Sequence, residues 1–154
     1  MKRRDSIKLS PRHEWFAYAV IAVVFVTGAG WACLHHLVTR PNEFGASSPA
    51  ETWILKAHGA AAAIVLVLVG TLLPLHVKFA WRAGRNLRTG LSLLVFFGFL
   101  TITGYGLYYA GGEQIRAWTS TAHLWVGLAL PPIMLLHIWR GKTTRPGRKA
   151  ARRK

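Results

Sequence analysis

The stretch AHGAAAAIVLVLVGTLLPLHV, residues 57–77, contains no Asp, Glu, Lys or Arg and carries a histidine near each end. An α-helix needs about 20 apolar residues to cross roughly 30 Å of hydrocarbon. This stretch therefore predicts a transmembrane helix. An isolated strand is excluded, because lipid offers no hydrogen-bond partners for backbone N–H and C=O groups.

Three other stretches share this composition: residues 15–38, 89–112 and 117–139 also lack charged side chains. The sequence therefore predicts an all-α membrane protein, a four-transmembrane-helix bundle. Its halves are alike, since VTGAGWACLHH (26–36) is similar to ITGYGLYYAGG (102–112). The second and fourth stretches also share a histidine early and a histidine late. These similarities indicate a duplicated two-helix hairpin.

Basic residues flank the predicted spans unevenly. The 154-residue chain has 20 Lys and Arg against 5 Asp and Glu, a net charge of +15, and most basic residues lie before the first span, in the loop 78–88 and after the fourth span. The positive-inside rule places these segments in the cytoplasm. We expect a basic cytoplasmic leader (1–13), a transmembrane domain (14–140) and a basic cytoplasmic tail (141–154). The tail lacks interleaved aromatic residues, so we expect contact with the lipid bilayer and none with nucleic acid.

Four glycines lie inside the apolar stretches, Gly28, Gly30, Gly104 and Gly106. Glycine in a membrane helix commonly lets a neighbouring helix approach closely. A flat macrocycle lying against bare backbone is the alternative interpretation.

Histidines within the spans carry the functional prediction. His58 and His76 lie 18 residues apart on the second span, and His123 and His137 lie 14 residues apart on the fourth. These spacings place each pair on nearly one helix face. An imidazole in hydrocarbon is costly and normally faces the bundle interior with a partner. Two rings at one depth can supply both axial ligands of a haem iron. We expect two noncovalent b-type haems, an outer one on His58 and His123 and an inner one on His137 and His76.

The inner pairing has an alternative. Eighteen residues rise about 27 Å and fourteen about 21 Å, so His76 lies about 6 Å deeper than His137 if the outer rings are level. A kink at Pro74 can absorb part of this difference. His13, at the cytoplasmic mouth of the first span, is the alternative ligand. The lone Cys33, with no Cys-x-x-Cys-His motif in the chain, excludes a covalently attached c-type haem.

Basic residues near the span ends are candidates to pair with haem propionates. Lys56 and Arg116 are placed for the outer haem. Lys78, Arg82 and Arg140 are placed for the inner one.

The histidine pattern resembles the four-helix di-haem cytochrome b family. This family includes the membrane subunits of formate dehydrogenases and nickel-iron hydrogenases and the small bacterial cytochromes b of the five-sixty-one superfamily. The resemblance covers about residues 12–140. Its most specific element is His123-x13-His137 on the last span, followed by His58 with Gly59 at the start of the second.

One position departs from the family pattern. The remaining inner ligand of the family comes from a His-Trp near the start of the first helix, whereas RHEWF here has Glu14 between His13 and Trp15. The internal repeat favours His76 instead, and both candidates stay open.

The resemblance implies a b-type di-haem cytochrome that carries electrons across the bacterial inner membrane between a quinone pool and a redox partner. It implies an electron-transfer subunit of an oxidoreductase complex more than an autonomous enzyme. The expected partners are quinone or quinol, a periplasmic or membrane redox protein, and a larger complex or a homo-oligomer. The alternative function is a haem-free structural or assembly subunit whose histidines form hydrogen bonds at helix contacts.

Overall fold

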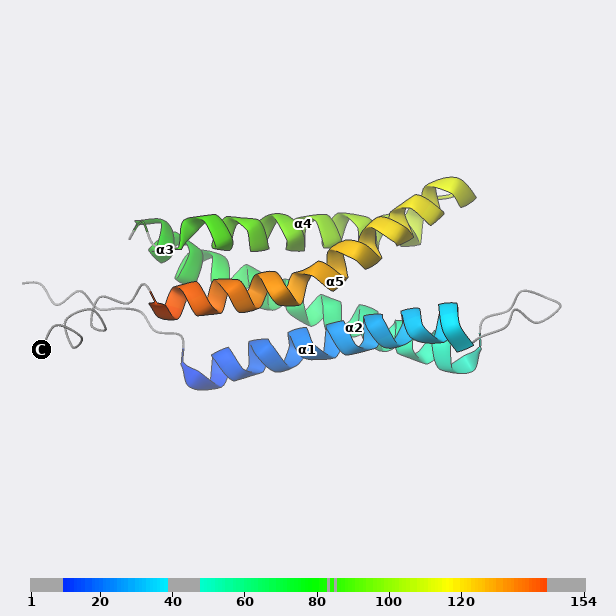
Figure 1. The fold of residues 1–154 in the computed structure, drawn as a ribbon, viewed down its shortest axis with the longest axis horizontal. Helices are drawn as coiled ribbons and strands as arrows, with labels where there is room; N and C mark the ends of the chain where they lie inside the picture. Colours follow the sequence, from blue (N-terminus) through cyan, green and yellow to red (C-terminus); the bar gives the residue numbers. More distant parts are fainter. Residues whose placement is uncertain (1–9, 39–47, 83, 85, 144–154) are drawn as a thin grey trace, which may run out of the picture. The chain divides into compact units, whose positions relative to one another are not determined.

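The computed structural model describes residues 10–38, 48–82, 84 and 86–143, and nearly all of these are helical (Figure 1). The leader up to residue 9, the loop 39–47 and the tail from residue 144 lie outside the described residues. The elements in chain order are α1 (Pro11–Cys33), the π-helix η1 (Leu34–Val38), α2 (Pro49–Leu72), the π-helix η2 (Leu73–Val77), α3 (Lys78–Arg82), α4 (Leu87–Tyr109) and α5 (Glu113–Thr143). The predicted all-α fold class is confirmed.

Four helical segments are long and apolar enough to cross a membrane. They are Pro11–Leu37, Pro49–Leu72, Leu87–Tyr109 and Glu113–Thr143. Many large apolar side chains on them are exposed, as illustrated by Leu37 at 80% and Ile102 at 73%. Soluble proteins rarely expose so much apolar surface, whereas lipid solvates it. The chain is therefore a multi-pass membrane protein, as predicted.

The chain forms two compact units, Met1–Phe79 and Ala80–Lys154. In the first unit α1 packs against α2. The buried apolar residues of α2 are Ala61, Val65 and Leu68, and their spacing of four and three residues places them on one face of the helix. Val20 and Ala32 are the buried residues of α1. Small and β-branched side chains thus form the contact between the two helices.

Serine and proline residues start both helices of the first unit. The Ser10 hydroxyl accepts a hydrogen bond from the His13 backbone N–H, and Pro11 follows it at the first helical position. Ser48 and Glu51 form a capping box at the start of α2. Near the other end of α2, Pro74 lies in η2, where it cannot donate a backbone hydrogen bond and the helix widens to a π-helical turn.

In the second unit α4 packs against α5. Gly84 (φ 62°) and the N-cap residue Asn86 (φ 51°) both adopt left-handed backbone conformations in the turn before α4, and these two residue types tolerate them best. Pro131 and Pro132 lie inside α5 and remove two backbone donors. Figure 1 shows α5 changing direction along its length, as expected for a helix with internal prolines.

Candidate functional site

His58 of α2 is held against α1 by two oxygen atoms. Its Nδ1 lies 2.9 Å from the backbone oxygen of Val24 and 3.2 Å from the hydroxyl of Thr27. The Thr27 hydroxyl donates its own hydrogen to the backbone oxygen of Val23 at 2.7 Å. A carbonyl oxygen can only accept a hydrogen bond, so Nδ1 of His58 must be the protonated nitrogen.

His123 of α5 makes the corresponding contact with α4. Its Nδ1 lies 2.8 Å from the hydroxyl of Thr103, and that hydroxyl donates to the backbone oxygen of Phe99 at 2.8 Å. With its one hydrogen used, the hydroxyl accepts at the imidazole. Nδ1 of His123 is therefore also a donor.

His137 of α5 has two neighbours at Nδ1. The hydroxyl of Thr89 lies 3.0 Å away, and the amide nitrogen of Asn86 lies 3.2 Å away. Thr89 donates to Asn86 Oδ1 at 2.6 Å, and Asn86 Nδ2 donates to the His137 backbone oxygen at 2.9 Å. These contacts allow Nδ1 of His137 either role, whereas those of His58 and His123 allow only donation.

Each of these three threonines is followed by a glycine that backs the same imidazole. A Cβ atom added to Gly28 would lie 2.9 Å from Cε1 of His58. The corresponding distances are 3.5 Å from Gly104 to His123 and 3.5 Å from Gly90 to His137. We call each pair of residues, 27–28, 89–90 and 103–104, a Thr–Gly seat. In each seat the hydroxyl binds Nδ1, and the bare Cα leaves room for the edge of the ring.

The Thr–Gly seats fix the tautomer of two rings. A neutral imidazole protonated on Nδ1 carries its lone pair on Nε2. Histidines that ligate metals almost always donate their other ring N–H to a carbonyl or a similar acceptor, which orients the ring and raises its basicity. His58 and His123 have this arrangement.

His13 and His76, the two candidates for the inner pair, both lie in the first unit. His13 is half-buried in the first turn of α1, and its Nε2 is buried without a hydrogen-bond partner among the described residues. His76 is exposed and lies in η2, two residues after Pro74. Glu14 next to His13 accepts a hydrogen bond from the Tyr18 hydroxyl at 2.7 Å.

The basic residues proposed as propionate partners lie at helix ends. Arg116 donates from Nη1 to the backbone oxygen of Leu107 at 2.8 Å, which satisfies a carbonyl in the last turn of α4. The Lys56 ammonium lies 4.8 Å from the centre of the Trp53 ring. The remaining candidates, Lys78, Arg82 and Arg140, have exposed side chains.

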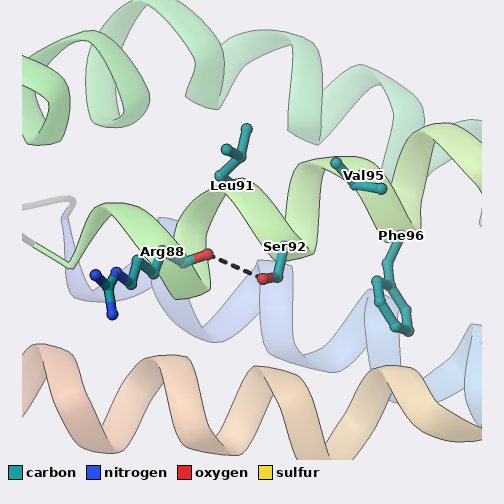
Figure 2. Close-up of a pocket in the computed structure, with 5 residues that line it drawn as sticks. All are labelled: Arg88, Leu91, Ser92, Val95 and Phe96. Atoms are coloured by element: carbon teal, nitrogen blue, oxygen red, sulfur yellow. Dashed lines mark hydrogen bonds between the residues drawn. The ribbon is translucent and has the colours of Figure 1, made fainter.

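Arg88, which the sequence analysis did not select, lines a depression on α4. The depression has a volume of about 360 Å³ and is lined by Arg88, Leu91, Ser92, Val95 and Phe96 (Figure 2). These five residues share one face of α4, and the Ser92 hydroxyl donates to the Arg88 backbone oxygen at 2.9 Å. One cationic side chain therefore adjoins an apolar surface directly before the seat of His137.

The threonines and Asn86 were also missed by the sequence analysis. The available signal was the Thr-Gly dipeptide, which occurs at positions 27, 89 and 103. The repeat VTGAG and ITGYG contains two of these dipeptides, and the structure shows that the corresponding histidine of each hairpin lies against each of them.

The described residues contain no group of three or more His, Cys, Asp and Glu side chains that could hold a metal ion. A haem needs only two axial protein ligands, because the macrocycle supplies the others. No family model, curated protein or solved structure matches the chain, so what it binds must be argued from its own residues.

Proposed function

We propose that this protein is a b-type di-haem cytochrome that carries electrons across the bacterial inner membrane, with its termini in the cytoplasm. The observation that carries the proposal is the hydrogen bonding of His58 and His123, whose Nδ1 atoms donate to oxygen acceptors on the neighbouring helix. This leaves the lone pair of each neutral ring on Nε2, the nitrogen that would bind iron.

The outer haem takes one ring from each unit, His58 and His123. Both rings lie against a Thr–Gly seat of the same repeated sequence, so the two hairpins present them in the same way. Bis-histidine ligation leaves no open position for small ligands, which suits electron transfer rather than chemistry at the iron.

The inner haem takes His137 and a ring of the first unit. In the second unit, 14 residues separate both the two seats (Thr89 and Thr103) and the two histidines. The residue 14 positions before Thr27 on α1 is His13, so a ring already occupies the corresponding level of the first unit.

Depth and burial favour His13 over His76 for this ligand. His13 lies about 21 Å below the level of Thr27, which matches the rise between His123 and His137. His76 lies 18 residues from His58, about 27 Å in a regular helix. The Nε2 atom of His13 is also buried without a hydrogen-bond partner in the described part of the chain. A ligand nitrogen in an apolar interior fits that environment, because iron would replace the missing partner.

Arg88 is a further candidate to pair with an inner-haem propionate. It lies one residue before the seat of His137 and borders an apolar depression. This combination suits a ligand with an apolar body and anionic groups at its edge. When bound, haem supplies a one-electron redox centre, and the protein supplies ligands, orientation and charge.

A haem-free structural subunit is the competing function. The same Thr–Gly contacts would satisfy a histidine that only packs between two helices. The two functions differ in one property that is simple to measure, which is absorbance in the visible region.

The test is the spectrum of the purified full-length protein, produced in haem-replete bacterial cells. We expect a Soret band and sharp α and β bands on reduction with dithionite, which are typical of six-coordinate low-spin haem b. Colourless protein that is folded and helical by circular dichroism would overturn the proposal and favour the structural subunit.

A further inference from the structure

A second polar cluster lies where α1 leads through η1 toward the start of α2. Glu51 is buried, with 1% of its surface exposed, although it sits in the first turn of α2. Its Oε2 accepts a hydrogen bond from the Ser48 backbone N–H at 3.2 Å. This capping contact explains the presence of Glu51 but not its burial, because capping boxes form equally well at the surface.

The second carboxylate oxygen of Glu51 faces an imidazole. Oε1 lies 3.5 Å from Nδ1 of His35 in η1, close enough for an ion pair with a protonated ring, and it makes no hydrogen bond within the described residues. The His35 side chain is 50% exposed, in contrast to 2% for the Glu51 side chain. A buried carboxylate therefore lies behind a half-exposed imidazole, on the side of Nδ1.

Aromatic rings surround this imidazole. Trp31 stacks on His35 with ring centres 4.7 Å apart and planes 11° apart, and His36 meets His35 edge to face at 5.0 Å. The cluster offers flat π surfaces at the end of a predicted span, where lipid-soluble molecules enter from the membrane interface.

We infer that His35 and Glu51 form a binding site for the hydroquinone headgroup of a membrane quinol, in which Nε2 of His35 accepts a hydrogen bond from a quinol hydroxyl. Glu51 is the positioning residue. Its carboxylate can only accept, so it holds the hydrogen of His35 on Nδ1 and the lone pair on Nε2. The same arrangement of a buried carboxylate behind a histidine orients the general base of hydrolases, and such contacts are often long before substrate binds.

This inference rests on the proposed function, because an electron carrier in the membrane needs a lipid-soluble donor or acceptor. The site also lies close to the outer ligand. Glu51 precedes His58 by seven residues, two turns on one face of α2, or about 11 Å along the helix axis.

The arrangement predicts a preference for one redox state of the ligand. Nε2 of His35, as an acceptor, binds the hydroxyl of a quinol but not the carbonyl of a quinone. Glu51→Gln should reverse this preference. The glutamine oxygen must take the place of Oε2, since only it can accept from the Ser48 N–H, and the amide NH₂ then faces His35. Nδ1 becomes an acceptor, and Nε2 becomes the donor that a quinone carbonyl needs.

The experiment measures binding of decylubiquinol and decylubiquinone to the full-length protein in lipid nanodiscs by titration calorimetry. The quinol is titrated into dithionite-reduced protein and the quinone into oxidised protein, so that no electrons are transferred. We expect about tenfold tighter binding of quinol than of quinone in the wild type and the opposite order in Glu51→Gln. Nitrogen-15 NMR of labelled histidines should show the His35 proton moving from Nδ1 to Nε2 in this variant.

Glu113→Gln is the matched control, because Glu113 is also an acidic residue in a first helical turn but is exposed. It should bind both ligands as the wild type does. His35→Gln should weaken quinol binding about tenfold. The inference is overturned if the wild type shows no preference, if Glu51→Gln keeps the wild-type ratio, or if His35→Gln binds quinol normally. The haem absorbance of the same samples reports separately on the proposed function.

Discussion

Nδ1 of His123 lies 2.8 Å from the hydroxyl oxygen of Thr103, and that hydroxyl has already donated its hydrogen to the backbone of its own helix. One threonine therefore fixes both the rotation and the tautomer of an imidazole on the next helix. The same contact joins Thr27 and His58 in the other hairpin. Repetition of the contact in both halves indicates that the orientation of these rings matters to the protein.

Removing the hydroxyl of Thr103 should weaken haem binding without unfolding the hairpin. Thr103→Val keeps the side-chain shape but leaves Nδ1 of His123 without its acceptor. Loss of an outer-shell partner of this kind typically costs about 10- to 100-fold in affinity. Haem titration into the apoprotein measures this cost. Thr103→Ser restores the acceptor and should bind haem nearly as the wild type does, and equal affinity in all three proteins would contradict the assigned role of Thr103.

The seat glycines should tolerate no side chain where a ring lies against them. Gly28→Ala places a Cβ 2.9 Å from Cε1 of His58, so the ring must shift. Overpacking of this kind costs about 1–3 kcal/mol. We expect loss of the outer haem signal in the reduced spectrum. Gly30→Ala is the matched control, since a Cβ there has no atom within 4 Å, and it should leave both haems in place. Equal haem content in the two variants would rule out the seat.

The two candidates for the inner ligand can be separated by single substitutions. His13→Gln should lower the haem content by one per chain, because its buried Nε2 would lose iron as its partner. His76→Gln should leave the content unchanged. The haem-to-protein ratio after purification measures both. The reverse result would assign the inner site to His76, as the internal repeat alone predicted.

Arg88 should raise the potential of the inner haem. A cation near a propionate favours the reduced iron, which carries one less positive charge, so Arg88→Gln should lower the midpoint potential. For an exposed ion pair worth about 0.2–1 kcal/mol, the shift is about 10–40 mV. Redox titration followed at the α band measures it. Lys142→Gln removes an exposed cation near the end of α5 and serves as the control. Equal potentials in the two variants would remove Arg88 from the haem environment.

The membrane helices were predictable from the sequence, because uncharged stretches long enough to cross hydrocarbon admit only one regular structure. The stretch 57–77 marks α2 and η2 closely, and its final residues include Pro74. The π-helical turn at 73–77 was not predicted, although a proline inside a span requires some local adjustment of backbone hydrogen bonding.

The depth of the histidines was also readable from the sequence, but their partners were not. A residue count places His58 and His123 on faces and at levels, yet the acceptor of each ring depends on how two helices pack. Thr27 and Thr103 look like ordinary polar residues in an apolar span until a neighbouring helix is placed beside them. The buried state of Glu51 was hidden for the same reason, because its capping role is local and its contact with His35 is not.

The haem content of the purified wild type, compared with that of His123→Gln, tests the central claim most directly. The pyridine haemochromogen assay gives this content as moles of haem per mole of chain. If imidazoles from separate helices share iron at two levels, the wild type should contain two haems and the variant one. A wild type without haem, or a variant that keeps the full wild-type content, would contradict the account.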